Sequence, residues 1–467
     1  MTRSMWNRPS ACAFSVMHSQ HPSSNAFSVI RSHQPFSNWT RGDSRGLPVP
    51  SAIARFTTIA LFTVAAALAQ TPAAPAPPTP TPNAAPLTSN VQGASYPQMT
   101  PDHRVTFRLR AADATKVQVR VELPKSITLD LAKSDGGYWL ATTDPLPPGF
   151  WYYSVIVDGF TTLDPASKTF FGYGRECSGI EIPGPDSVLW DAVDVPHGTL
   201  RDVWYYSQST QAWRRAKVYT PPTYDKDPTA RFPVLYLQHG AGENETSWTN
   251  QGRETFIMDN LYSVRTSTKP MIIVNDNGIV PARTPTTPGA RGRSMADNKF
   301  EEFGQILINE LIPYIDKNFR TLADRDHRAF AGLSMGGSQT FRLGLSHLDT
   351  FAWLGAFSAA VANLDLATDY NGKLADAALN KQLKLFWMGV GKQDGLHDGL
   401  LAIHDALQKA GTKHIWVESE GGHVWGEWRG YLSEFASLLF QDTAPYPAAT
   451  LPAPIPNSTP APKKRIP

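Results

Sequence analysis

The chain has 467 residues, of which 41% are hydrophobic and 18% are charged. This composition is typical of a folded globular protein, and the length exceeds what one hydrophobic core usually fills, so we expect more than one domain. The formal net charge is +2, and no lysine- and arginine-rich stripe is interleaved with aromatic residues, so nucleic acid is not an expected partner. The two cysteines, Cys12 and Cys177, are not part of any metal-ligand spacing, so neither a metal nor another cofactor is expected.

Residues 1–70 are predicted to form an N-terminal extension that ends in a signal peptide. The apolar run over residues 59–69 is too short to span a bilayer, and it follows Arg55 and ends in a small-residue cleavage site. This pattern predicts a secreted or periplasmic protein with no stable membrane insertion. The apolar run begins late for a signal peptide, so we expect the true start of the protein near Val49.

Residues 71–90 are rich in proline, alanine and threonine, which predicts an extended linker. A similar proline-rich tail covers residues 443–467. We expect neither segment to carry chemistry.

Residues 91–190 alternate apolar and polar side chains. The alternation is clear over residues 105–109, 117–121 and 153–157, and turns that contain glycine or proline separate these runs. Short strands of period two, joined by short turns, predict a small β-sandwich.

This region resembles the early-set immunoglobulin-like domains that are grouped with carbohydrate-binding module family 48. The matching segments are Pro148-Gly149-Phe150-Trp151-Tyr152-Tyr153, Val157-Asp158-Gly159 and Leu163-Asp164-Pro165-Ala166. The resemblance implies an immunoglobulin-like β-sandwich. Three of its aromatic residues are Trp139, Trp151 and Tyr152. They either stack on a sugar ring, or they lie in the sandwich core or cover the catalytic region, and we favour the second alternative.

From residue 196 to residue 441, apolar runs alternate with stretches of helical periodicity. The predicted buried parallel strands are residues 234–237, 271–274 and 385–390. The predicted helices are residues 303–315, 400–410 and 428–440, and residues 200–206 and 214–219 alternate like antiparallel edge strands. This order predicts an α/β fold with a sheet covered on both faces.

Within this region, Gly332-Leu333-Ser334-Met335-Gly336 lies between the strand-like residues 328–331 and the helix-like residues 337–343. A G-x-S-x-G motif between a strand and a helix is typical of a nucleophile elbow, in which glycines allow a turn too tight for larger side chains. We therefore predict that Ser334 is a catalytic nucleophile.

A serine nucleophile needs a base and an acid that orients the base, and in α/β-hydrolases the acid and then the histidine follow the serine in the chain. His423 lies in a loop after the predicted strand at residues 415–417, and it precedes the last helix. Asp394 directly follows the strand that ends at Val390, with Asp398 as the alternative acid. We predict that His423 is the base and that Asp394 orients it.

The oxyanion of acyl transfer needs hydrogen-bond donors. The first predicted donor is the backbone N–H of Met335, directly after the nucleophile. The second is the N–H of Ala241, with Gly242 as the alternative, because Gln238-His239-Gly240-Ala241-Gly242 forms a glycine-rich loop after the strand at residues 234–237.

The catalytic region resembles carbohydrate esterase family 1, which includes feruloyl and acetylxylan esterases and relatives of esterase D and the enterochelin esterases. Matching segments include Val218-Tyr219-Thr220-Pro221-Pro222, Leu237-Gln238-His239-Gly240-Ala241-Gly242, Ala331-Gly332-Leu333-Ser334-Met335-Gly336-Gly337 and Gly421-Gly422-His423. The resemblance implies an α/β-hydrolase fold, a triad at Ser334, Asp394 and His423, and hydrolysis of feruloyl or acetyl esters on xylan. The alternatives are a siderophore esterase, an acyltransferase and a noncatalytic carbohydrate-binding protein.

Three residues are candidates for substrate binding: Trp248, Arg283 and Trp425. Arg283 belongs to a long basic loop at residues 281–297, whose arginines either meet an acidic substituent of the substrate or are solvated. The expected partner is a polysaccharide or small-molecule ester, and the sequence does not select the acyl group or the oligomeric state.

Overall fold

The computed structural model describes residues 83–265, 267–280, 300–361, 368, 372, 374–376 and 378–442. The predicted N-terminal extension, most of the linker, the loop at residues 281–297 and the tail at residues 443–467 lie outside these residues. Among the described residues, none of the helices has the length and apolar character needed to cross a bilayer.

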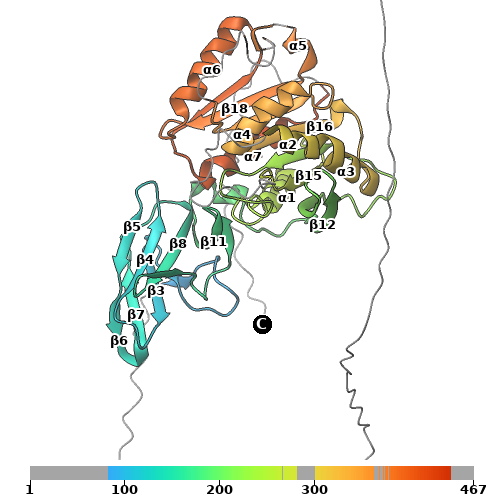
Figure 1. Ribbon diagram of the computed structural model, residues 1–467. Coiled ribbons are helices and arrows are strands. Elements are labelled where there is room, and N and C mark those ends of the chain that lie inside the picture. The colour runs from blue at the N-terminus through green and yellow to red at the C-terminus, as the bar shows by residue number, and fades with distance from the viewer. Residues whose placement is uncertain are drawn as a thin grey trace, which may run out of the picture. The chain divides into compact units, whose positions relative to one another are not determined.

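The N-terminal region contains two antiparallel sheets (Figure 1). The five-stranded sheet has the order β1-β2-β3-β7-β6, formed by Ala85–Pro86, Gln98–Met99, Val105–Arg110, Tyr138–Thr142 and Ala132–Ser134. The six-stranded sheet has the order β10-β11-β8-β4-β5, with β9 paired to β8, formed by Phe170–Gly172, Arg175–Ile182, Gly149–Val157, Val117–Glu122, Ile127–Asp130 and Phe160–Thr162. Strand β1 lies inside residues 71–90, the range predicted as linker, and its Ala85 and Pro86 pair with Met99 and Gln98.

The two sheets share one core, because alternate side chains of their strands point inward. In β4, for example, Val117, Val119 and Val121 are buried while the residues between them are not. Across the core, the rings of Phe107 in β3 and Tyr153 in β8 lie 5.2 Å apart. The predicted arrangement of two sheets around one core is confirmed. That this arrangement is immunoglobulin-like stays a prediction.

The larger region is built on an eight-stranded sheet with the order β12-β13-β15-β14-β16-β17-β18-β19. The strands are Thr199–Ser207, Ala212–Thr220, Ile272–Asp276, Val234–Gln238, Arg328–Leu333, Trp353–Phe357, Leu385–Gly391 and Ile415–Ser419, in sheet order. Strands β12 and β13 are antiparallel, and the six from β15 onward are parallel to one another. The predicted strands are therefore confirmed; β17 was not predicted.

Helices cover both faces of this sheet (Figure 1). The helices are α1 Glu254–Val264, α2 Phe300–Ile306, α3 Ile312–Asn318, α4 Met335–Gln339, α5 Leu379–Gln382, α6 His397–Ala410 and α7 Trp425–Leu438. The predicted helices correspond to α2 with α3, to α6 and to α7; α1 was not predicted.

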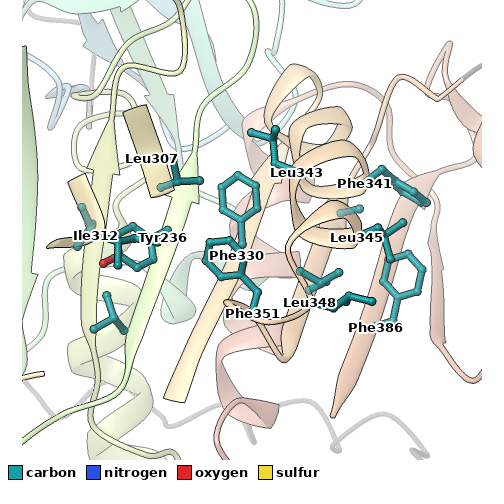
Figure 2. Packing of buried hydrophobic residues seen from close by; sticks show 14 of the residues in the cluster. Tyr236, Leu307, Ile312, Phe330, Phe341, Leu343, Leu345, Leu348, Phe351 and Phe386 are labelled. Carbon is teal, nitrogen blue, oxygen red and sulfur yellow. The ribbon is translucent and has the colours of Figure 1, made fainter. Parts of the chain in front are cut away.

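Alternate residues of each central strand enter different cores. Val234 and Tyr236 of β14 belong to the core with α2, α3 and α6, whereas Leu235 and Leu237 belong to the core with α1 and α7. Figure 2 shows the first of these cores, where the rings of Phe330 and Phe351 stack at 5.3 Å.

The second core also extends beyond the large sheet. It includes Phe150, Tyr152 and Phe170 of the N-terminal sheets, together with residues of α1 and α7. The N-terminal region is therefore packed into the same apolar cluster that supports the helix following His423.

The parallel strands bring their carboxyl ends to one edge of the sheet. The glycine-rich loop follows β14, Ser334 follows β16, and Asp394 lies three residues beyond the end of β18. Ligands and catalytic groups of open α/β sheets are found at this edge, so the topology predicts that these residues meet there.

Candidate active site

Ser334 occupies a strained turn between β16 and α4. Its φ is 52° and its ψ is −111°, a conformation that residues other than glycine rarely adopt. Its backbone N–H donates to the Phe357 carbonyl at 2.8 Å, and its carbonyl accepts from the Ser338 N–H at 3.0 Å. These bonds hold the strained turn that projects the hydroxyl from the sheet edge.

The two motif glycines are required by close backbone contact. A Cβ at Gly332 would lie 2.7 Å from the Gly336 carbonyl carbon, and a Cβ at Gly336 would lie 2.7 Å from the Gln238 carbonyl oxygen. No side chain fits at either distance, so the end of β14 and the turn can approach only with glycine at both positions.

Ser334, His423 and Asp394 form a continuous chain of hydrogen bonds. His423 Nε2 lies 3.0 Å from Ser334 Oγ, and His423 Nδ1 lies 2.9 Å from Asp394 Oδ2. An ionised carboxylate can only accept, so Nδ1 carries the proton and Nε2 is left to accept from the serine hydroxyl. This is the arrangement in which a histidine acts as general base toward a serine.

The Asp394 side chain is fully buried and held by further donors. The Leu396 N–H donates to its Oδ1 at 2.9 Å, and the Ser358 hydroxyl also hydrogen-bonds to it. Burial by itself would raise the pKa of this carboxyl, but the hydrogen bond and charge of His423, with these donors, lower the pKa below its ordinary value. Asp394 is therefore ionised when His423 acts as base.

The alternative acid, Asp398, is turned away from this site. Its side chain is exposed, and its Oδ1 pairs with His397 Nδ1 at 2.9 Å. The neighbouring His397 also contacts Glu418 at 2.8 Å, so these three residues form a separate surface cluster.

The glycine-rich loop after β14 faces Ser334. Gly240 and Ala241 line the same cavity as Ser334 and His423, whereas Gly242 is not part of its lining. The Gly240 N–H donates to Glu243 Oε2 at 2.9 Å, and the Gly242 carbonyl accepts from the Gly174 N–H at 2.7 Å. The position of Ala241 suits an oxyanion donor better than that of Gly242.

This cavity has a volume of about 240 Å³, and both regions of the protein line it. The N-terminal sheets and their loops contribute Glu122, Leu123, Pro124, Phe150, Trp151, Tyr152 and Tyr173. A larger cavity of about 960 Å³ borders the β12–β13 hairpin, but none of the triad residues lines it. The chemistry of the lining, and not the volume, therefore marks the 240 Å³ cavity as the candidate active site.

Residues 207–437 match the model of a protein family described as putative esterase. These residues, here called the esterase region, are therefore similar to that family.

The chain is also similar to two curated xylan-degrading enzymes. It is 37% identical over 358 residues to an endo-1,4-beta-xylanase/feruloyl esterase of Xylanibacter ruminicola, a match that covers 75% of this chain and 47% of that protein. It is 33% identical over 314 residues to endo-1,4-beta-xylanase Y of Acetivibrio thermocellus, covering 62% of this chain and 27% of that protein. The chain thus spans less than half the length of these relatives.

Among solved structures, the enterobactin esterase FES of Shigella flexneri has a TM-score of 0.52 at 18% identity. The match covers 72% of this chain and 92% of FES. This likeness supports the predicted α/β-hydrolase fold of the esterase region.

Of the residues predicted to bind substrate, Trp425 lies at the cavity and Trp248 does not. Trp248 is 1% exposed, its indole N–H donates to the Gln238 carbonyl at 2.9 Å, and its ring packs edge-on against Trp425 at 5.3 Å. The prediction for Trp248 was therefore wrong: it is a core residue that supports Trp425 from behind. Arg283 lies outside the described residues.

The aromatic residues of the N-terminal region are buried, as the favoured reading predicts. Trp139 and Trp151 lie in the core between the two sheets, and each indole N–H donates to a backbone carbonyl. Tyr152 instead points into the esterase region. The sequence analysis did not identify the wall that this region contributes to the active site, and only the aromatic density of residues 150–153 hinted at it.

Proposed function

We propose that this protein is an exported serine esterase that hydrolyses feruloyl or acetyl esters on plant cell-wall polysaccharide, chiefly xylan. The observation that carries the serine mechanism is the pair of hydrogen bonds from Ser334 through His423 to Asp394, at 3.0 and 2.9 Å. The substrate class is supported by the relatives, one of which is named as a xylanase and feruloyl esterase. Export is supported by the signal-peptide pattern before residue 70.

The reaction follows from the geometry in two steps. Ser334 Oγ attacks the ester carbonyl while His423 Nε2 takes its proton, and the N–H groups of Met335 and Ala241 stabilise the oxyanion. The intermediate collapses as His423 returns the proton to the departing alcohol, which leaves an acyl-enzyme. Water then attacks the acyl carbon, with His423 again as base, and releases the free acid and Ser334.

The cavity wall favours an aromatic acyl group over acetyl. Aromatic rings surround the space next to Ser334, and flat apolar walls suit the ring of a ferulate better than they suit a methyl group. The rings are those of Phe150, Tyr152, Tyr173, Trp425 and Trp428. We therefore expect feruloyl esters to be turned over with the higher kcat/KM.

The test is a comparison of the full chain with its Ser334→Ala variant. Loss of the nucleophile should lower kcat on p-nitrophenyl acetate by at least ~10⁴-fold. Circular dichroism checks that the variant is folded. Hydrolysis at the unaltered rate by Ser334→Ala would refute the serine mechanism.

A second candidate, hydrolysis of a catecholate siderophore ester, is favoured by the similarity to FES across both regions of the chain. A panel of methyl ferulate, acetylated xylan and a catecholate siderophore separates the candidates. We expect release of ferulate; release from the siderophore alone would replace the xylan assignment with this one.

A further inference from the structure

Tyr152 belongs to strand β8 of the N-terminal region, but its hydroxyl lies among residues of the esterase region. The Gln251 side-chain amide donates to it at 2.7 Å, and the Trp425 indole N–H donates to it at 3.2 Å. The hydroxyl also lies 3.3 Å from Glu243 Oε1 and 3.4 Å from the Phe171 carbonyl oxygen. One buried hydroxyl thus contacts three residues of the esterase region, two in the loop between β14 and α1 and one at the start of α7.

The hydrogen-bonding capacity of a hydroxyl decides where its proton goes. A tyrosine hydroxyl has one proton and can accept two bonds, and Gln251 and Trp425 occupy the accepting positions. Its proton is therefore left for Glu243 or for the Phe171 carbonyl. An ionised carboxylate is the stronger acceptor, so the bond goes to Glu243 when that residue is charged.

Glu243 also contacts the loop beside the nucleophile. Its second oxygen, Oε2, accepts the Gly240 N–H at 2.9 Å. A Cβ at Gly240 would lie 3.2 Å from that oxygen and 3.5 Å from Ser334 Cβ, so the carboxylate holds the backbone that lies directly against the nucleophile. The adjacent residue is Ala241, the proposed oxyanion donor.

Trp425, the other partner, comes two residues after His423 and begins helix α7. Trp425 is also a lining residue of the cavity. The Tyr152 hydroxyl is therefore joined both to the loop that carries the oxyanion donor and to the segment that carries His423.

We propose that Tyr152 is a positioning residue: through Glu243 and Trp425 it holds the oxyanion loop against Ser334, so that the N-terminal region completes the catalytic site. The inference rests on the proposed serine esterase function. It assigns the N-terminal region a part in catalysis that does not depend on glycan binding.

The experiment compares Tyr152→Phe with Tyr153→Phe in the full chain. Tyr153 is the next residue of the same strand, is also buried, and donates its hydroxyl proton to Asp164 at 2.8 Å inside the N-terminal region. Each variant loses one buried hydroxyl that contacts a carboxylate, so both should lower the melting temperature. Only Tyr152→Phe should lower kcat on p-nitrophenyl acetate.

For Tyr152→Phe we expect kcat to fall about 10-fold while KM stays within twofold, because acylation and deacylation both pass through an oxyanion. The loss is moderate because an oxyanion hydrogen-bond donor that is displaced costs less than one that is deleted. Tyr153→Phe should keep kcat within twofold. An unchanged kcat in Tyr152→Phe, or a change confined to KM, would overturn the proposal.

Glu243→Gln supplies an independent variant if Tyr152→Phe does not fold. It should lower kcat by a similar factor, and the double variant should lose less than the product of the two single losses, because both remove the contact between Tyr152 and Glu243. Additive losses, or an active Glu243→Gln, would contradict the proposal. If Ser334→Ala abolishes activity while Tyr152→Phe retains it, the positioning role fails and the serine esterase function stands.

Discussion

A buried ion pair fastens the N-terminal region to the helix that follows the catalytic histidine. Arg429 of α7 is 0% exposed, and its Nη1 and Nη2 contact the two carboxylate oxygens of Glu181 in β11 at 2.8 and 3.0 Å. The guanidinium also donates to the Gln251 carbonyl and lies 5.3 Å from the Trp190 ring centroid. The change we consider is Glu181→Gln, which removes the counter-charge with little change in shape.

The variant leaves the buried Arg429 guanidinium without its paired carboxylate. It also removes the carboxylate that Arg253 Nε contacts at 3.4 Å. Two charge-assisted hydrogen bonds are weakened or lost, each worth roughly 1.5–3 kcal/mol. Removing one partner of a buried ion pair generally costs about 3–5 kcal/mol, which agrees with the sum for two such hydrogen bonds. The bond to Gln251 survives, so we expect a loss of about 3–4 kcal/mol in the free energy of unfolding.

Urea unfolding, followed by tryptophan fluorescence, measures this loss. Asp225→Asn is the matched control, because Arg201 Nη2 contacts both Asp225 oxygens at 3.1 and 2.9 Å but at an exposed position; it should cost less than ~1 kcal/mol. Replacing both partners, in Glu181→Leu/Arg429→Met, should cost less than Glu181→Gln, since no charge stays buried. If Glu181→Gln costs no more than the control, the reasoning about burial is refuted.

Three further predictions concern single residues. Asp394→Asn should lower kcat by roughly 10³-fold or more because the histidine loses its orientation, while Asp398→Asn should be fully active; equal activities in an ester assay would reverse the assignment of the acid. Gly336→Ala should lower the melting temperature and reduce kcat at least ~10-fold, because its Cβ would lie 2.7 Å from the Gln238 carbonyl oxygen. Gly430→Ala in α7, where a Cβ meets nothing within 4 Å, should instead be neutral or stabilising, and a harmless Gly336→Ala would contradict the packing argument. Burial raises the pKa of Glu254 from 4.5 to about 8. The native state therefore keeps a proton that the unfolded chain loses near pH 4.5. Because of this group, the free energy of unfolding falls as pH rises from 4.5 to 8, by up to roughly 1.4 kcal/mol per pH unit. Glu254→Gln removes this contribution. The variant should therefore gain stability relative to the unaltered protein between pH 5 and pH 8, as measured by the difference in their unfolding free energies. A constant difference would show that Glu254 does not titrate in that range.

Local sequence was sufficient for most of the strands and helices, though not for β17 or α1, and for most of the geometry of the predicted triad. The turn at Ser334 depends on residues within two positions of it, and its glycines are required by contacts that any such turn makes. Asp394 and His423 lie 29 residues apart in the chain, and His423 and Ser334 lie 89 apart, yet their placement was predictable. The reason is that parallel strands bring their carboxyl ends to one edge of the sheet, so chain order largely determines which loops meet.

Tertiary structure alone decided what surrounds those three residues. Trp248 and Trp425 look alike in sequence, but one is a core residue and the other lines the cavity, because burial depends on which elements pack above each ring. The contact between Tyr152 and Glu243 joins residues 91 positions apart and that between Tyr152 and Trp425 joins residues 273 apart. No periodicity or motif encodes such a contact, since it depends on how the N-terminal sheets pack against α1 and α7. The sequence by itself determined the candidate nucleophile, base and acid and the two-region layout, and packing between the regions determined the wall and the supports of the candidate site.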